Sequence, residues 1–458
     1  MISTPKLYGA FALIIASAAL GAPGKPPEHP RPAAGAGIIT PIATIGEPGP
    51  LTEVMPGVFV VFANSPAAAF LMTTKGTLTA LYTFPVNMGL AYPHPLQAVN
   101  GRIYGQEGTN SGTPSTTANF SLSLAGQLQT YPVTATKYAP LLSIQLPNGD
   151  LYGTESNFAL AKDNALVTLT LSGTAKIIHS FTADEGIAYG LPILGTDGNL
   201  YGISGLGASQ SHTSSAMVYR VTPAGDLTIL ASYPDWRNGY DPGYYKETLL
   251  QASNGDFYGT AALGGSKRAG AILQLTPAGT LTTLHEFSNL ASGIPTVLIE
   301  GTDHNLYGAT QGTASSASSL FRISLSGQFE TLQVINPTAI GSCPCGLTLG
   351  SDGKFYGATL AGPGGGTAWV WDLGLPPPKP KVTGVVPTSG ATGSVVMVNG
   401  EFLLGATGVS FNGTPATTFS NISANYVSVT VPTGATTGPI TVTTARGSST
   451  SAGSFTVE

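Results

Sequence analysis

Hydrophobic and polar positions along this chain alternate in short runs, and the runs repeat with a period of about 50 residues. In one repeat, two predicted strands (residues 247–253 and 256–262) flank Asn254-Gly255, and two more (270–276 and 280–287) flank a Pro-Ala-Gly turn. Asn-Gly favours a two-residue hairpin because both positions of a type I′ turn have positive φ. The pattern predicts four antiparallel strands per repeat, which is one blade of a β-propeller.

The clearest mark of the repeat is a turn rich in Asp, Asn and Gly, followed by an apolar residue and a Tyr-Gly pair. The tyrosine lies at positions 104, 152, 201, 258, 307 and 356, so successive copies are 48, 49, 57, 49 and 49 residues apart. We interpret the tyrosine as a ring packed between blades and the glycine as room for a close approach. His179 and His285 share one repeat position with Tyr82, and we interpret them as packing residues too.

The number of blades follows from counting hairpins. A degenerate repeat with Met55-Pro56-Gly57-Val58 at the first hairpin precedes the six clear ones, which makes seven first hairpins but only six complete second hairpins. The seventh repeat stops at its third strand, residues 367–373, and a lone predicted strand at 37–45 would pair beside it and close the ring. We therefore predict an all-β fold with a seven-bladed propeller over residues 37–375. Six or eight blades are the alternatives.

The rest of the chain divides into four shorter parts. Residues 1–22 are typical of a signal peptide, since Lys6 precedes an apolar run that is too short to span a bilayer. An uncleaved anchor is the alternative. Proline-rich linkers are predicted at 23–36 and 376–380. Residues 381–458 contain short alternating runs that predict a small immunoglobulin-like β-sandwich.

Two families resemble these parts. The Asp/Asn-Gly-x-Leu/Phe-Tyr-Gly core and the run Gly-Thr-Leu-Thr-Thr-Leu at 279–284 resemble the GloVer-type tandem repeat of bacterial exported proteins, over roughly residues 51–373. The C-terminal part resembles an IPT/TIG domain in segments 386–393, 398–402, 409–414, 431–438 and 454–457. The first resemblance implies an exported protein, secreted or held at the cell surface or in the periplasm. The second implies an interaction or spacer module with an immunoglobulin-like fold.

The composition argues against nucleic acid as a partner, and the spacing of the polar residues argues against a bound metal or cofactor. Only 9% of the residues are charged and the net charge is −5, which argues against nucleic acid as a partner. The recurring Asp and Asn side chains lie on different blades, so we predict no metal and no cofactor, with calcium as the less favoured alternative. The two cysteines, Cys343 and Cys345, would form a strained disulfide. We favour a local structural role for them, with a redox role as the alternative.

One long connection is the candidate ligand site. Both repeated hairpin turns lie at one end of a blade, so the connections of variable length lie at the other end, where binding usually resides. The longest is residues 233–247. Its aromatic and charged side chains, which suit stacking and hydrogen bonding to sugars or peptides, are Trp236, Arg237, Tyr240, Asp241, Tyr244 and Tyr245. The alternative is that these aromatic rings only cover a neighbouring blade.

We therefore expect an exported, monomeric, non-enzymatic binding or surface-associated protein with a glycan or protein ligand and no membrane span after signal removal. The alternative is a carbohydrate-active hydrolase or lyase on a propeller scaffold, because propellers host such chemistry. Hydrolysis needs two carboxylates about 5–10 Å apart. The candidates are Glu107, Glu155, Asp184, Glu185, Asp235, Asp241 and Glu247. A structural cell-envelope protein is the second alternative.

Overall fold

The structure is a computed structural model of the chain. It describes residues 37–85, 88–90, 95–109, 118–131, 139–146, 148–157, 162–182, 184–188, 191–205, 216–233, 249–261, 265–267, 269–288, 294–312, 317–361 and 365–458. The all-β prediction is confirmed, because strands dominate this part of the chain and α1 (Pro337–Ile340) is its single helix.

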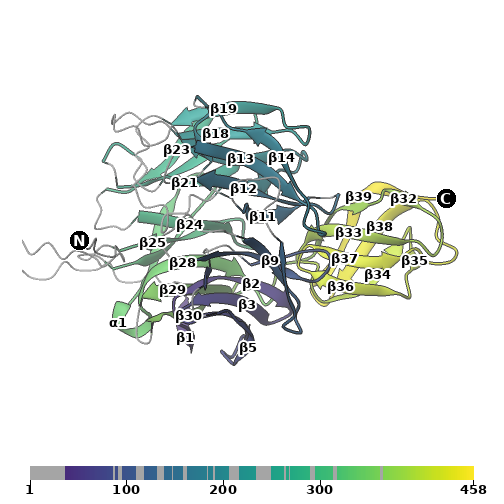
Figure 1. Cartoon of the computed structure of the whole chain (residues 1–458), viewed down its shortest axis with the longest axis horizontal. Helices are drawn as coiled ribbons and strands as arrows, with labels where there is room; N and C mark the ends of the chain where they lie inside the picture. The colour runs from purple at the N-terminus through teal and green to yellow at the C-terminus, as the bar shows by residue number, and fades with distance from the viewer. Residues whose placement is uncertain are drawn as a thin grey trace, which may run out of the picture. The chain divides into compact units, whose positions relative to one another are not determined.

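Seven antiparallel sheets of four or five strands are formed by the described residues between Ile38 and Asp372 (Figure 1). Six of them use strands consecutive in sequence. The first contains β2 (Pro48–Met55), β3 (Val58–Asn64), β4 (Ala67–Thr73) and β5 (Leu78–Thr83). The second contains β6 (Met88–Leu90), β7 (Leu96–Gln97), β8 (Ile103–Thr109), β9 (Ala118–Leu122) and β10 (Leu128–Tyr131). The third contains β11 (Leu141–Gln145), β12 (Leu151–Asn157), β13 (Lys162–Leu169) and β14 (Ala175–Ser180). The fourth contains β15 (Ile187–Ala188), β16 (Ile193–Leu194), β17 (Leu200–Gly205), β18 (Ala216–Val221) and β19 (Leu227–Tyr233). The fifth contains β20 (Leu249–Gln251), β21 (Phe257–Ala261), β22 (Ala271–Leu275) and β23 (Leu281–Glu286). The sixth contains β24 (Ile294–Glu300), β25 (Leu306–Gln311), β26 (Ser319–Ile323) and β27 (Phe329–Val334).

The seventh sheet joins the two ends of the repeat region. It contains β28 (Ser342–Leu349), β29 (Phe355–Ala361), β30 (Thr367–Asp372) and, at its edge, β1 (Ile38–Thr44). β1 runs antiparallel to β30, from Ile38 opposite Asp372 to Thr44 opposite Thr367. An N-terminal strand thus supplies the fourth strand that the last repeat lacks.

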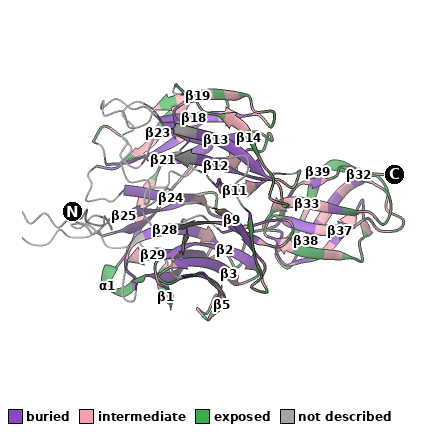
Figure 2. Ribbon diagram, viewed as in Figure 1, coloured by how far each residue is buried: buried purple, intermediate pink, exposed green. Residues whose placement is uncertain are grey.

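The hydrophobic core lies mainly between neighbouring sheets. Figure 2 shows the central strands of the sheets as predominantly buried. One cluster, for example, joins Tyr258 and Ile272 of the fifth sheet to Leu298 and Phe321 of the sixth. The rings of the six Tyr-Gly tyrosines are each at most 2% exposed, because successive blades enclose them.

The Tyr-Gly pair has a packing role that the structure makes explicit. A Cβ atom at Gly357 would lie 2.3 Å from two ring atoms of Trp369, so only glycine leaves room for that ring. The hydroxyl of Tyr201 donates to Asp197 Oδ2 at 2.8 Å and therefore ties the strand to its own turn. Tyr307 and Tyr356 bond their turn aspartates in the same way.

Residues 381–457 form a β-sandwich. One sheet contains β31 (Lys381–Val386), β33 (Val395–Glu401), β37 (Tyr426–Thr430) and β36 (Phe419–Ser423). The other contains β32 (Ser389–Gly390), β39 (Gly447–Val457), β38 (Gly438–Thr444), β34 (Ala406–Phe411) and β35 (Thr414–Pro415). Val398 and Val427 of the first sheet share one buried cluster with Val409, Ile440 and Phe455 of the second. The narrower identification as an IPT/TIG domain stays a prediction.

Candidate functional site

The ligand site predicted from the sequence lies outside the described residues. Trp236, Arg237, Tyr240, Asp241, Tyr244 and Tyr245 all belong to residues 234–248. The strands on either side are described. β19 ends at Tyr233, which pairs with Ala216 at the end of the sheet opposite the Gly225 turn. The described residues on either side of the segment, Tyr233 and Leu249, thus lie at the end of their sheets away from the short turns. The role of the segment in binding stays a prediction.

The candidate carboxylates of a hydrolase are described only in part. Asp235, Asp241 and Glu247, together with the side chain of Glu107, lie outside the described residues, whereas Glu155 is buried on β12 and Asp184 is exposed. Glu185 accepts hydrogen bonds from the Thr182 N–H at 2.8 Å and from His179 Nε2 at 3.1 Å. Burial raises the pKa of Glu185, but these hydrogen bonds outweigh it and hold the pKa below its ordinary value. Glu185 thus has a local structural partner in His179.

The second repeated histidine packs as the sequence suggests. The imidazole of His285 stacks on Phe329 with ring centroids 3.9 Å apart and an angle of 7° between the planes. Burial lowers its pKa, so its neutral form is favoured. Among the described residues, no group of three or more His, Cys, Asp or Glu side chains could hold a metal ion. The side chain of Cys343 lies outside those described, so the disulfide to Cys345 stays a prediction.

A set of hydrogen bonds between neighbouring blades was missed by the sequence reasoning. A Gln or Glu at the end of a first strand accepts the N–H of a residue in the short turn of the preceding blade. The four pairs, with distances from nitrogen to oxygen, are Gln145 with Val99 (2.7 Å), Gln251 with Thr196 (2.8 Å), Glu300 with Ser253 (2.8 Å) and Glu53 with Ser351 (2.8 Å). We call this arrangement the blade latch. Its signal is a Gln or Glu four residues before the turn position that is usually glycine.

The sandwich domain contacts the propeller at the end that carries these short turns. The Tyr426 hydroxyl donates to the main-chain carbonyl of Gln145 at 3.0 Å. Arg446 Nη1 donates to the carbonyl of Ser351 at 3.4 Å. In the connecting segment, the carbonyl of Pro376 accepts the hydroxyl of Thr302 at 3.0 Å. The short-turn end is thus more than a scaffold, since it also holds the second domain.

Arg446 is the polar centre of this junction. Its Nη2 donates to the carbonyls of Phe402 at 3.0 Å and Leu404 at 2.7 Å, both in the sandwich domain. Burial lowers the pKa of the guanidinium, and the nearby Glu53 carboxylate works in the opposite direction. The side chain therefore fixes the loop 402–404 and ties it to the β28–β29 turn.

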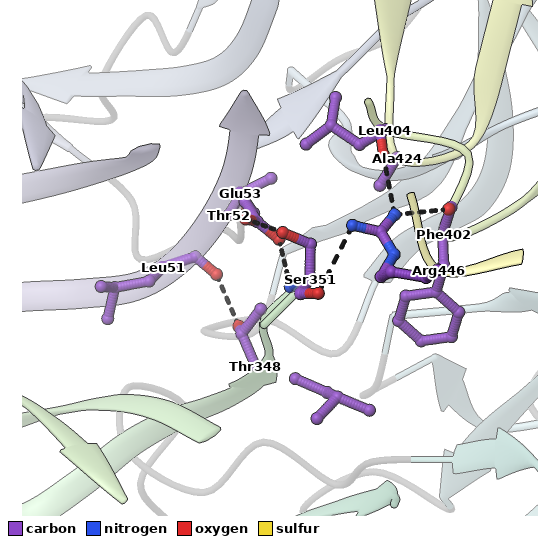
Figure 3. A pocket seen from close by; sticks show the side chains of 10 residues that line it. Leu51, Thr52, Glu53, Thr348, Ser351, Phe402, Leu404, Ala424 and Arg446 are labelled. Atoms are coloured by element: carbon purple, nitrogen blue, oxygen red, sulfur yellow. Dashed lines mark hydrogen bonds between the residues drawn. The ribbon is translucent and has the colours of Figure 1, made fainter. Parts of the chain in front are cut away.

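A pocket of about 190 Å³ lies at the junction (Figure 3). The propeller contributes Leu51, Thr52, Glu53, Thr348, Leu349 and Ser351, and the sandwich domain contributes Phe402, Leu404, Ala424 and Arg446. Glu53 Oε1 accepts the N–H of Gly57 and the hydroxyl of Ser351, each at 2.7 Å, while Oε2 accepts the Ser351 N–H. The junction pocket is thus a concave site with walls from both domains.

The repeated four-stranded sheets define a protein of the β-propeller class. Residues 138–371, just over half of the chain, match the Gloeobacter/Verrucomicrobia repeat. The chain belongs to this family, as the GloVer resemblance predicted. Among curated proteins, nothing matches.

Solved structures agree on the fold. A streptogramin B lyase is similar with a TM-score of 0.52 and 16% identity, over 73% of this chain and 98% of that one. The virginiamycin B lyase of Staphylococcus aureus is similar with a TM-score of 0.51 and 14% identity, over 73% of this chain and 99% of that one. Identities this low establish the propeller fold and do not transfer an activity.

In the part of the chain that the structure describes, no helix combines the length and the apolar character that a membrane crossing requires.

Proposed function

We propose that this chain is an exported, non-enzymatic binding protein whose propeller offers a ligand site on the face opposite its short turns. The observation that carries the proposal is the position of the sandwich domain. Its contacts through Tyr426 and Arg446 occupy the short-turn end. Tyr233 and Leu249, the described residues on either side of the longest connection, belong to the other end of their sheets, away from these contacts.

Rigidity supports the same proposal. The blade latches and the strand β1 join neighbouring blades and both ends of the repeat region. A scaffold of this kind holds loops in fixed relative positions, which lowers the entropy cost of ligand binding. The ligand class that suits aromatic rings beside short polar groups is a glycan or a peptide surface.

The proposal is tested by screening the full chain against a glycan array and against extracellular proteins of a bacterial host. Binding is expected to fall at least tenfold in Trp236→Ala and Tyr244→Ala. The matched control is Ile177→Ala, which alters an exposed apolar residue on strand β14 and should leave binding unchanged. Binding that ignores both aromatic substitutions would remove the site.

Two further measurements test whether the protein lacks enzymatic activity and whether it is exported. Each ligand found is incubated with the protein, and the release of shortened sugars or unsaturated products would contradict the non-enzymatic assignment. Fractionation of cells that express the chain with and without residues 1–22 tests export. Retention of both forms in the cytoplasm would contradict it.

A further inference from the structure

The junction pocket has walls from two domains. Leu51 and Leu349 of the propeller line it together with Phe402, Leu404 and Ala424 of the sandwich domain. An engineered apolar cavity of about 150 Å³ holds one benzene molecule. A volume of about 190 Å³ therefore suits a single six-membered ring with a small substituent.

Most polar groups around the pocket are already committed to protein partners. Thr52 Oγ1 donates to the carbonyl of Pro95 at 2.7 Å, and Thr348 Oγ1 donates to the carbonyl of Leu51 at 2.6 Å. The Ser351 hydroxyl donates to Glu53. A carboxylate has about four accepting positions, and the bonds to Gly57 and Ser351 fill three of those on Glu53. One accepting position, on Oε2, remains for a hydroxyl donor.

Charge at the pocket favours a neutral ligand. The carboxylate of Glu53 and the guanidinium of Arg446 offset each other, so a ligand of either sign would be repelled by one of them. Three of the five N–H donors of Arg446 bond to main-chain carbonyls, whereas its Nε is buried without a hydrogen-bond partner. Its role is to hold the loop that carries Phe402.

The backbone conformation of Phe402 is an independent indication that the pocket is a ligand site. Its φ is +54°, a left-handed conformation that bulky residues rarely adopt. Such strain persists where surrounding contacts hold it, and it is often found at ligand sites. Here the carbonyl of Phe402 accepts Arg446 Nη2, and the side chain lines the pocket.

We propose that the junction pocket binds one small neutral molecule consisting of a six-membered ring with a hydroxyl group, which donates to Glu53 and packs against Phe402. Phenols and pyranosides share this chemistry. Because the walls come from both domains, the ligand binds only when the domains are in contact. By linkage, it stabilises that contact.

The experiment uses the full chain and three probes, namely phenol, methyl β-glucopyranoside and the ring-free alcohol hexan-1-ol. Calorimetric titration measures affinity, and hydrogen–deuterium exchange of residues 402–404 measures domain contact. The test variants are Ala424→Leu and the milder Ala424→Val, which fill the pocket. The matched control is Ala391→Leu, at an exposed alanine of the same domain outside the pocket.

The expected result is binding of phenol, the pyranoside or both, with slower exchange at 402–404 and at least tenfold weaker binding in the filled variants. Which ring compound binds identifies the source of the ligand. Binding of hexan-1-ol alone, binding unchanged in Ala424→Val, or no binding of any probe at millimolar concentration would each overturn the proposal.

Discussion

Glu53 and Ser351, 298 residues apart, are joined by two hydrogen bonds: the carboxylate accepts the Ser351 N–H at 2.8 Å and the Ser351 hydroxyl at 2.7 Å. The pair links the first and last blades beside the strand exchange that places β1 on β30. It also forms one wall of the junction pocket. A single side chain therefore takes part in ring closure and in the contact with the second domain.

Replacing Glu53 with Ala should destabilise the propeller by about 3 kcal/mol, because the Ser351 and Gly57 N–H groups lose their acceptor inside the protein. Urea unfolding measures the effect. The control is Glu401→Ala, which removes an exposed ion pair with Lys381 and should cost less than about 1 kcal/mol. Equal losses in the two variants would contradict the latch role.

Gly357→Ala should cost about 3 kcal/mol or more, since its new methyl group would collide with the fully buried ring of Trp369. Gly384→Ala is the matched control. A Cβ there meets no atom within 4 Å, and its φ is not in the left-handed region. Thermal unfolding should separate the two variants clearly. An unfolding temperature of Gly357→Ala equal to that of the wild type would contradict this prediction, because it would mean that the Trp369 ring can move aside without a loss of stability.

His304 occupies a turn position where the other six described turns have glycine, and its φ of +61° is left-handed. Its Nδ1 lies 3.2 Å from Glu300 Oε1 and 3.0 Å from Ser253 Oγ. Both His304→Gly and His304→Ala lose these contacts, but only glycine also relieves the strain. We expect the Gly variant to be more stable than the Ala variant by about 1 kcal/mol, measured by chemical denaturation. The reverse order would show that backbone strain is unimportant here.

Alkaline pH should loosen the domain junction. Burial raises the pKa of Tyr426 from 10.0 to about 12, so the folded protein keeps the hydroxyl neutral while the unfolded chain ionises. The contribution is fully present below pH 10 and is lost as the pH rises from 10 to 12, at most about 3 kcal/mol.

The comparison variant is Tyr426→Phe, which also lacks the hydrogen bond to Gln145. Denaturation of both proteins between pH 9 and 12 should show a stability difference that shrinks as the pH rises. A difference that stays constant across this range would contradict the assignment to Tyr426.

Much of the fold could be predicted because the sequence patterns that specify it lie within single repeats. The turn glycines, the alternating runs and the Tyr-Gly spacing each act within one repeat, so the sequence placed the sheets, the short turns and the buried rings correctly. The predicted turn type was wrong, because Gly255 has a positive φ and Asn254 does not, which excludes a type I′ turn. The blade latches escaped because Gln145 and Val99 lie on different blades. Their periodic Gln and Glu positions were visible in the sequence, but a polar residue at a strand end is usually assigned to solvent.

The sequence by itself determined that this chain is an all-β repeat protein of the Gloeobacter/Verrucomicrobia family, because strand alternation and turn chemistry are encoded residue by residue. Only the tertiary structure decided which surfaces meet. Contacts such as Tyr426 with Gln145 and Arg446 with Ser351 bring together residues 281 and 95 positions apart. No local pattern specifies such a pairing, since it depends on the combined shape and charge of two folded domains.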